Sequence, residues 1–360
     1  MKKFIAIALS MVVAWTFVVP ALAVQHDDVL LDVSEKEYCE DVIEQIADST
    51  IRTADARNQI NLEDSFYLYN FADQPIAIYY KLEPVGYAIY DFIASTVLEY
   101  TTECEHPFYV DASQKYYYEG VFNYYKAVPG GFENLATGQI KTINSQYEFT
   151  SSDFYHNSEN NGVTTKASEG PVYLENDTRL YNCNTAENLS YFYPDLSQAD
   201  LDDCPGICGS LACAVLIAYF DDYRSDLAGN GDFATDWKKV SGEGTDDAYG
   251  KPLVKELVAL IEPSANGSVF LNPGVSAYLR ERDITGRVSM GALTVYQQTK
   301  NAIGSDGSGD PLIVGTTSHY SVGVGYKNIS KKQIYTNTGY GYHSWINAST
   351  IISTWTMHID

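Results

Sequence analysis

The chain has 360 residues, of which 45% are hydrophobic, and this is enough apolar material for one or two cores. Its formal net charge of −24 at pH 7 excludes nucleic acid and anionic membrane surfaces as partners, because both are negatively charged. Thirty tyrosines, many of them in the first half, are typical of strands with one face buried and the other in water.

The N-terminal residues 1–23 predict a secretory signal peptide. Residues 1–3 are a basic start, residues 4–19 are apolar, and Ala21-Leu22-Ala23 is a small-residue cleavage box. The apolar run is too short for a membrane span. We therefore expect a secreted, extracellular protein whose mature chain begins near residue 24.

Residues 24–150 predict a small α+β domain. Residues 34–37 are typical of a helical capping box, and apolar residues then recur at helical spacing, so we expect a helix over about 34–57. Residues 76–83 alternate as in a strand, and the turn at 84–86 leads to a second strand that begins at Tyr87. The pattern indicates one helix packed on a small antiparallel sheet.

A linker is predicted at 151–169, because this stretch is polar and too poor in apolar residues to order itself well. It is the place where we expect a proteolytic nick. The residues that follow, 170–360, form the second predicted domain. Within it the Gly- and Asp-rich stretch 225–250 indicates a surface loop rather than a calcium site, and a helix is expected over about 252–262.

Cys208 is the first candidate for chemistry. It stands with Gly209 and Ser210 directly before a run of apolar residues that predicts a buried helix. The free N–H groups and the positive dipole end of such a helix favour a thiolate, so Cys208 is a candidate nucleophile. The alternative is that it forms half of a disulfide in an exported protein.

His319 and Asn337 are the second and third candidates. Two strands are predicted within 311–326, and His319, which opens the second, has a side chain suited to act as general base for a thiol. Asn337 ends a short strand, and its amide oxygen can accept a hydrogen bond from the imidazole and fix the tautomer. Since Asn-x-Gly is also a turn signal, a purely structural role for Asn337 is the alternative.

The three candidates occur in the order Cys, His, Asn, as in papain-type peptidases, and three blocks of sequence resemble known families. Cys208-Gly209 with Ala214, Ala218, Tyr219 and Phe220 is similar to the Cys-Gly-x-x-x-x-Ala-x-x-x-x-Tyr-Tyr pattern of bacteriocin-leader-processing peptidases. Residues 319–326 resemble their His-Tyr-Val-Val-Val-Val-Gly-Tyr block, and residues 337–341 resemble the Asn-Trp-Gly-Trp-Gly block of streptopain. Residues 66–100 resemble the streptopain inhibitory prodomain.

The sequence departs from these families in two places. Their glutamine about six residues before the nucleophile, an oxyanion donor, is replaced by Asp202, whereas Gln198 lies six residues before Cys204. Cys204 is therefore a rival nucleophile, although Pro205-Gly206 after it indicates a loop. Thr338 replaces the tryptophan that follows the asparagine, and the backbone N–H of Cys208 remains as an oxyanion donor.

The resemblance implies an α+β fold: a papain-like catalytic domain, with a buried central helix and an antiparallel sheet, after an inhibitory prodomain of helix and antiparallel sheet. It implies a secreted cysteine peptidase made as a zymogen, which hydrolyses peptide bonds through Cys208, His319 and Asn337. The expected partners are a peptide or protein substrate and its own prodomain, and no metal or organic cofactor is expected. The alternatives are an inactive homologue that acts as an extracellular binding or adhesion protein, and another acyl transfer, such as that of a transglutaminase or amidase.

Six cysteines in an exported chain also indicate disulfides, while a nucleophile must stay reduced. Cys39 and Cys104 are the pair expected in the first half. Cys183 and Cys204 are the pair expected in the second, with Cys213 a buried thiol in the helix.

Overall fold

The computed structural model describes residues 33–50, 61–104, 114–142, 169–176, 207–224, 251–261, 271–291, 294–317 and 319–359. The predicted signal peptide, the predicted linker before Glu169, and the positions of Cys183, Gln198 and Cys204 lie outside these residues. Within the described part of the chain, no helix is both long and apolar enough to cross a bilayer.

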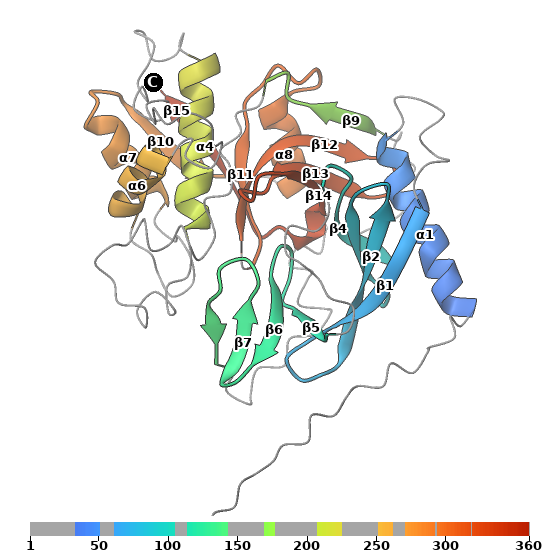
Figure 1. Cartoon of the computed structure of the whole chain (residues 1–360). Helices are drawn as coiled ribbons and strands as arrows, with labels where there is room; N and C mark the ends of the chain where they lie inside the picture. The colour runs from blue at the N-terminus through green and yellow to red at the C-terminus, as the bar shows by residue number, and fades with distance from the viewer. Residues whose placement is uncertain are drawn as a thin grey trace, which may run out of the picture.

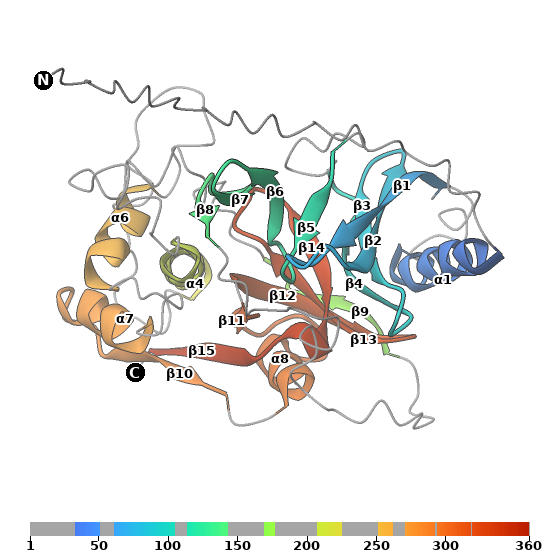
Figure 2. The ribbon, with the colours of Figure 1, turned by 90° about the horizontal axis from the view of Figure 1, so that it is seen from below.

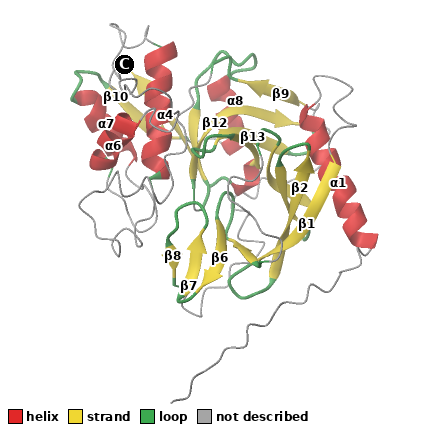
Figure 3. Ribbon diagram, in the orientation of Figure 1, coloured by secondary structure: helices red, strands yellow, loops and turns green. Residues whose placement is uncertain are grey.

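The protein has a mixed α+β fold in which one large sheet runs through both halves of the chain (Figures 1 and 3). Among the described residues the sheet has 15 strands, in the order β10-β15-β11-β12-β13-β14-β4-β3-β2-β1-β5-β6-β7-β8, with β9 on β12. The strands of the first half are β1 (Asn61–Tyr69), β2 (Pro75–Glu83), β3 (Tyr87–Asp91), β4 (Thr96–Thr101), β5 (Tyr116–Tyr118), β6 (Tyr124–Val128), β7 (Gly131–Asn134) and β8 (Ile140–Lys141).

The second half contributes the remaining strands and four of the α-helices described. The strands are β9 (Glu169–Tyr173), β10 (Gly286–Met290), β11 (Leu312–Gly315), β12 (Tyr320–Asn328), β13 (Lys332–Asn337), β14 (His343–Asn347) and β15 (Ser353–Ile359). The helices are α4 (Cys208–Tyr223), α6 (Lys251–Leu260), α7 (Leu271–Arg280) and α8 (Val295–Ile303), and a 3-10 turn, η5 (Ala348–Thr350), precedes β15. The helix expected over 252–262 is confirmed as α6.

The first-half helix is α1 (Val33–Thr50), which begins where the capping pattern places it. The residues at its expected C-terminal end, from 51 on, lie outside the described residues. Its Val42 and Ile46 pack on the face of the sheet made by β2, β3 and β4, and Gln45 Oε1 accepts the Val97 N–H at 2.9 Å. The apolar spacing read from the sequence thus produces the expected contact of helix with sheet.

The two halves meet at β4 and β14, which pair antiparallel through Trp345 opposite Tyr100 and Ile346 opposite Glu99. The antiparallel sheets expected in the two halves are therefore parts of one larger, mixed sheet. The first-half strands continue the sheet of the second half, and β1 pairs parallel with β5. The physical reason is that an edge strand presents unpaired N–H and C=O groups, which the edge of the other half satisfies.

Helix α4 is buried along nearly its whole length, as its continuous apolar run predicts. Figure 2 shows it nearly end-on, with α6 and α7 beside it, at the end of the molecule away from α1. It packs on α6, α7, β11 and β12. Because β12 starts just after His319, this packing brings the start of the helix to the start of that strand.

The disulfide expected between Cys39 and Cys104 does not form. Cys39, on α1, packs with the cluster around Val42 and Tyr90, whereas Cys104 packs with the cluster that contains α4. These clusters use different faces of the sheet, so the two sulfur atoms cannot meet. Cys213 is a fully buried thiol in α4, as expected.

Candidate active site

Cys208 is the first residue of α4, and its side chain is buried. Burial raises the pKa of the thiol, and the backbone N–H groups of Tyr320 and Gly209 act in the opposite direction. The Tyr320 N–H can do so only if it points at the sulfur. The thiol therefore lies against the residue that directly follows His319.

His319 is fixed at the end of a tight turn just before β12. Its backbone N–H donates to Thr316 Oγ1 at 3.1 Å, and its carbonyl accepts the Thr316 N–H at 2.9 Å. Nε2 of the imidazole lies 2.9 Å from the carbonyl oxygen of Thr338. Because a carbonyl oxygen only accepts, the neutral ring carries its proton on Nε2 and leaves Nδ1 able to take one.

Two aromatic rings enclose the imidazole. Tyr340 stacks on it at 5.1 Å between ring centroids, and Phe122 meets it edge-on at 5.3 Å. Burial lowers the pKa of His319 to about 4, although the hydrogen bond with Thr338 acts in the opposite direction. The ring is therefore neutral at physiological pH in this state of the protein.

Asn337 is the last residue of β13, opposite Val322 of β12, as the sequence predicts. Its Oδ1 accepts the N–H of Gly339 at 3.1 Å, so the amide oxygen closes a turn. The acceptor at the imidazole is instead the carbonyl of the next residue, Thr338. Sequence reasoning missed Thr338, because a backbone carbonyl leaves no signal in the residue type.

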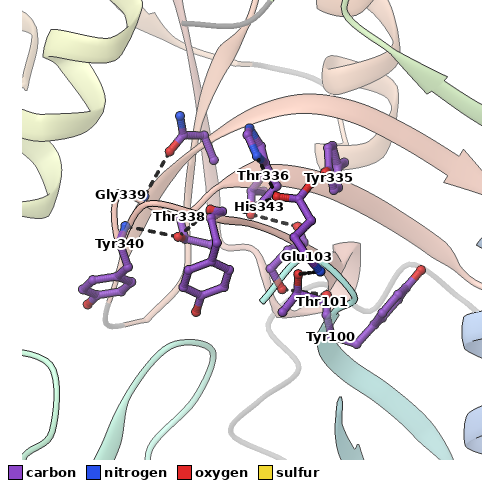
Figure 4. Close-up of polar contacts among 12 residues, drawn as sticks. Tyr100, Thr101, Glu103, Tyr335, Thr336, Thr338, Gly339, Tyr340 and His343 are labelled. Carbon is purple, nitrogen blue, oxygen red and sulfur yellow. Dashed lines mark hydrogen bonds and ion pairs between the residues drawn. The ribbon is translucent and has the colours of Figure 1, made fainter. Parts of the chain in front are cut away.

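The loop that carries this carbonyl, residues 338–342, is held by its own side chains (Figure 4). Thr338 Oγ1 donates to the Tyr342 carbonyl at 2.8 Å and accepts the Tyr340 N–H at 3.2 Å. Gly339 has a φ of +79°, and a Cβ there would come within 2.8 Å of a methyl carbon of Leu211 on α4. The loop therefore rests directly on the helix that begins with Cys208.

The first half of the chain covers this site from the other side. Phe122, whose ring touches His319, donates its backbone N–H to Oε2 of Glu99 at 2.9 Å. A second contact between the halves is made by Glu103, whose Oε2 accepts the His343 N–H at 3.1 Å and lies 3.3 Å from His343 Nδ1 (Figure 4). Glu103 also accepts the hydroxyl of Tyr335.

A cavity of about 830 Å³ lies elsewhere, at the junction of β4 and β9 with the loop after α8. It is lined by aromatic and acidic side chains, among them Tyr173, Trp345 and Glu175, and its lining includes none of Cys208, His319 and Asn337. Within the described residues no group of three or more His, Cys, Asp or Glu side chains is placed to hold a metal ion.

Comparison with known proteins gives one distant structural likeness. No family model matches the chain, and no curated protein matches it. The solved structure of a fragment of Prevotella intermedia prointerpain A is similar over 83% of this chain and 98% of that chain, with 11% identity and a TM-score of 0.38. Two chains at this TM-score need not share a fold, so the function rests on this chain's own residues.

Proposed function

We propose that the protein is a secreted papain-like cysteine peptidase, made as a zymogen with residues 1–23 as signal peptide and 24–150 as prodomain. The observation that carries the proposal is the meeting of Cys208, at the start of a buried helix, with the turn that holds His319. A structural helix does not require a thiol at this end, against the residue that follows an imidazole whose tautomer is fixed.

The chemistry follows from these positions. Nδ1 of His319 takes the proton of the Cys208 thiol, and the sulfur attacks the carbonyl carbon of a peptide bond to form a thioester. The amine leaves with the proton from the imidazolium, and a water molecule, deprotonated by His319, then hydrolyses the thioester. The backbone N–H of Cys208 supports the oxyanion, while the segment Asn337–Thr338 holds the ring: Thr338 through its carbonyl, Asn337 by closing the turn beneath it.

The protonation states of Cys208 and His319 are consistent with an inactive zymogen. With Phe122 on the imidazole, burial keeps the thiol protonated and His319 neutral, so no thiolate–imidazolium pair forms. Removal of the first half would expose the edge of His319 that Phe122 covers and raise the pKa of His319 towards its ordinary value. The covering of His319 by Phe122 of the first half is thus consistent with a prodomain.

The first test is the Cys208→Ala variant. We expect it to lose all hydrolysis of casein while its thermal unfolding stays within about 1–2 kcal/mol of wild type, because only one small buried group is removed. Cys213→Ala is the matched control: it removes a buried thiol from the same helix and should cost similar stability but retain activity. Cys204→Ala should also retain activity.

Hydrolysis by Cys208→Ala at the wild-type rate would contradict the assignment, and loss of activity in Cys204→Ala alone would transfer it to Cys204. Labelling with an irreversible thiol-directed peptidase inhibitor, followed by peptide mapping, gives the same answer independently. If the protein is instead an inactive homologue that acts as a binding protein, no cysteine should be labelled quickly.

A further inference from the structure

Glu99 is a carboxyl group buried where the two halves of the chain meet. It lies on β4 opposite Ile346 of β14 and is 0% exposed. Its Oε2 accepts the Phe122 N–H at 2.9 Å, whereas Oε1 is buried and has no hydrogen-bond partner among the described residues. A buried carboxylate with one neutral hydrogen bond from the protein is poorly compensated for its lost hydration.

The group that Glu99 holds is the loop that covers His319. This Phe122 loop, residues 119–123, joins β5 to β6 and is closed by the Glu119 N–H on the Asn123 carbonyl at 3.1 Å. Phe122 has a φ of +65°, which is uncommon for a residue with a bulky side chain and needs support from its surroundings. The bond from its N–H to Glu99 is such a support, and its ring then lies on the imidazole.

No positive charge among the described residues faces Glu99 to stabilise its ionised form. Tyr87 from β3 and Tyr342 from the turn before β14 are the titratable neighbours, and their hydroxyl groups are bonded to each other at 2.9 Å. Cys104 lies beyond these two phenols, and His319 lies beyond Phe122. Within the loop, Glu119 is in an ion pair with Lys141 of β8, and no ion pair in the described part of the chain includes Glu99.

We propose that Glu99 is a proton-dependent latch of the zymogen: while its carboxyl is neutral the Phe122 loop stays closed over it and on His319, and loss of the proton releases the loop, because the buried carboxylate must regain water. The inference rests on the proposed function, since it describes how the same site is kept covered. It assigns to a residue of the first half the role of sensing pH at the site.

The direction of the effect follows from burial, which raises the pKa of Glu99 well above its ordinary value of 4.5, against the opposing effect of the Phe122 N–H. The stability of the covered form is therefore complete below pH 4.5 and is lost as pH rises towards the raised pKa. In that window the equilibrium constant for covering falls by up to about tenfold per pH unit. Glu99 by itself therefore favours the closed form in acid and the open form as pH rises, whereas the buried His319 acts in the opposite direction below pH 6.5.

The test measures how fast diethylpyrocarbonate modifies His319 between pH 5.5 and 8.5, in a full-length Cys208→Ala background that cannot process itself. Glu99→Gln keeps an acceptor for the Phe122 N–H but does not titrate, so it stays latched. We expect equal rates in the Cys208→Ala parent and the Glu99→Gln variant at pH 5.5, and at least fivefold faster modification of the parent at pH 8.5. The two proteins are compared at the same pH, so the effect of imidazole protonation on the modification rate cancels.

The control is Glu103→Gln, four residues along the chain, whose carboxylate is already ionised at pH 5.5. Its modification rate should keep a constant ratio to that of its parent across the range. A ratio between the parent and the Glu99→Gln variant that does not change with pH, or that grows towards acid, would overturn the latch. If Glu99→Gln fails to fold, hydrogen exchange of the Phe122 amide is measured in the Cys208→Ala parent instead. The latch requires that the protection of this amide falls as pH rises, relative to the protection of the β11 amides.

Because this assay has no active thiol and reports only on access to a ring, its result does not depend on whether the protein is a peptidase. An active enzyme with a pH-independent ratio would disprove the latch alone. An inactive protein with the expected ratio would disprove the peptidase and leave the conformational switch.

Discussion

At the scale of single residues, the site depends on how one imidazole is held. Thr338 fixes the tautomer of His319 through its carbonyl, Tyr340 covers one face of the ring, and Phe122 meets it edge-on. The Thr338 carbonyl is in place only while the loop that carries it keeps its turn on α4. Gly339 is the residue of that loop on which the turn depends most directly.

We expect Gly339→Ala to destabilise the protein by about 2–4 kcal/mol and to reduce activity, because alanine is strained at φ +79° and its Cβ collides with Leu211. Gly130→Ala is the matched control. Gly130 also has a positive φ, +100°, but open space around it, so it should cost only the strain, about 1–2 kcal/mol. Urea unfolding of both variants measures the difference, and equal losses would show that the contact with Leu211 is unimportant.

Burial of His319 makes a prediction about pH. Its pKa is lowered from 6.5 to about 4, so it contributes stability above pH 6.5 that is lost as pH falls towards 4. Between pH 7 and 4.5 the Cys208→Ala protein should lose roughly 2–3 kcal/mol relative to the same protein with His319→Phe. Urea unfolding at the two pH values tests this. Equal losses of stability in the two proteins would mean that a group other than His319 causes the destabilisation in acid.

At the scale of elements, the pairing of β4 with β14 joins a strand of the first half to the strand that follows the loop 338–342. We call this junction of the two halves the seam, and side-chain hydrogen bonds cross it. Ser344 Oγ donates to the Tyr100 carbonyl at 2.8 Å, and Lys327 Nζ donates to the Tyr100 hydroxyl at 2.7 Å. Glu103 closes the seam at its end by binding His343. A change in one of these groups should therefore alter how firmly the halves are held together.

The Glu103→Gln variant tests how much this carboxylate contributes to holding the two halves together. Burial opposes ionisation of this carboxyl, but hydrogen bonds from His343 and Tyr335 prevail and lower its pKa to about 2. Its contribution is present above pH 4.5 and is lost as pH falls towards 2. We expect the variant to be about 1 kcal/mol less stable at pH 7, a value reduced for solvent screening, and to approach the stability of its parent as pH falls to about 2. A deficit that persists unchanged in acid would mean that the introduced amide disturbs packing instead.

At the scale of the whole molecule, the proposed zymogen must part a continuous sheet in order to become active. Cleavage between about Ser151 and Gly170 would cut the covalent link between the halves but leave the β4–β14 pairing to be broken separately. The freed β14 edge would then need water or another strand to satisfy its backbone groups.

Wild-type protein should therefore shorten at a site between Ser151 and Gly170 and gain activity as it does so, while Cys208→Ala protein keeps its full mature length. Mass spectrometry of both proteins over time, with activity measured in parallel, tests this. Wild-type protein that stays intact while fully active would contradict the zymogen and make the first half a permanent domain.

The sequence by itself determined the elements whose signals are local. The capping pattern and apolar spacing predicted the start of α1, the alternation predicted β2, and the continuous apolar run after Cys208 predicted the buried helix α4. The end of β13 at Asn337 also follows from a pattern within a few residues. Such signals are legible because neighbours in the chain are also neighbours in the element.

Only the tertiary structure decided what depends on residues far apart in the chain. The union of the halves through Tyr100 and Trp345, the parallel pairing of β1 with β5, and the absence of the Cys39–Cys104 bond all depend on which strand edges meet. The carbonyl of Thr338 at the imidazole and the carboxyl of Glu99 under Phe122 belong to the same class. The identity of a residue shows neither where its backbone oxygen points nor which distant loop buries its side chain. Those two features set the chemistry of this site.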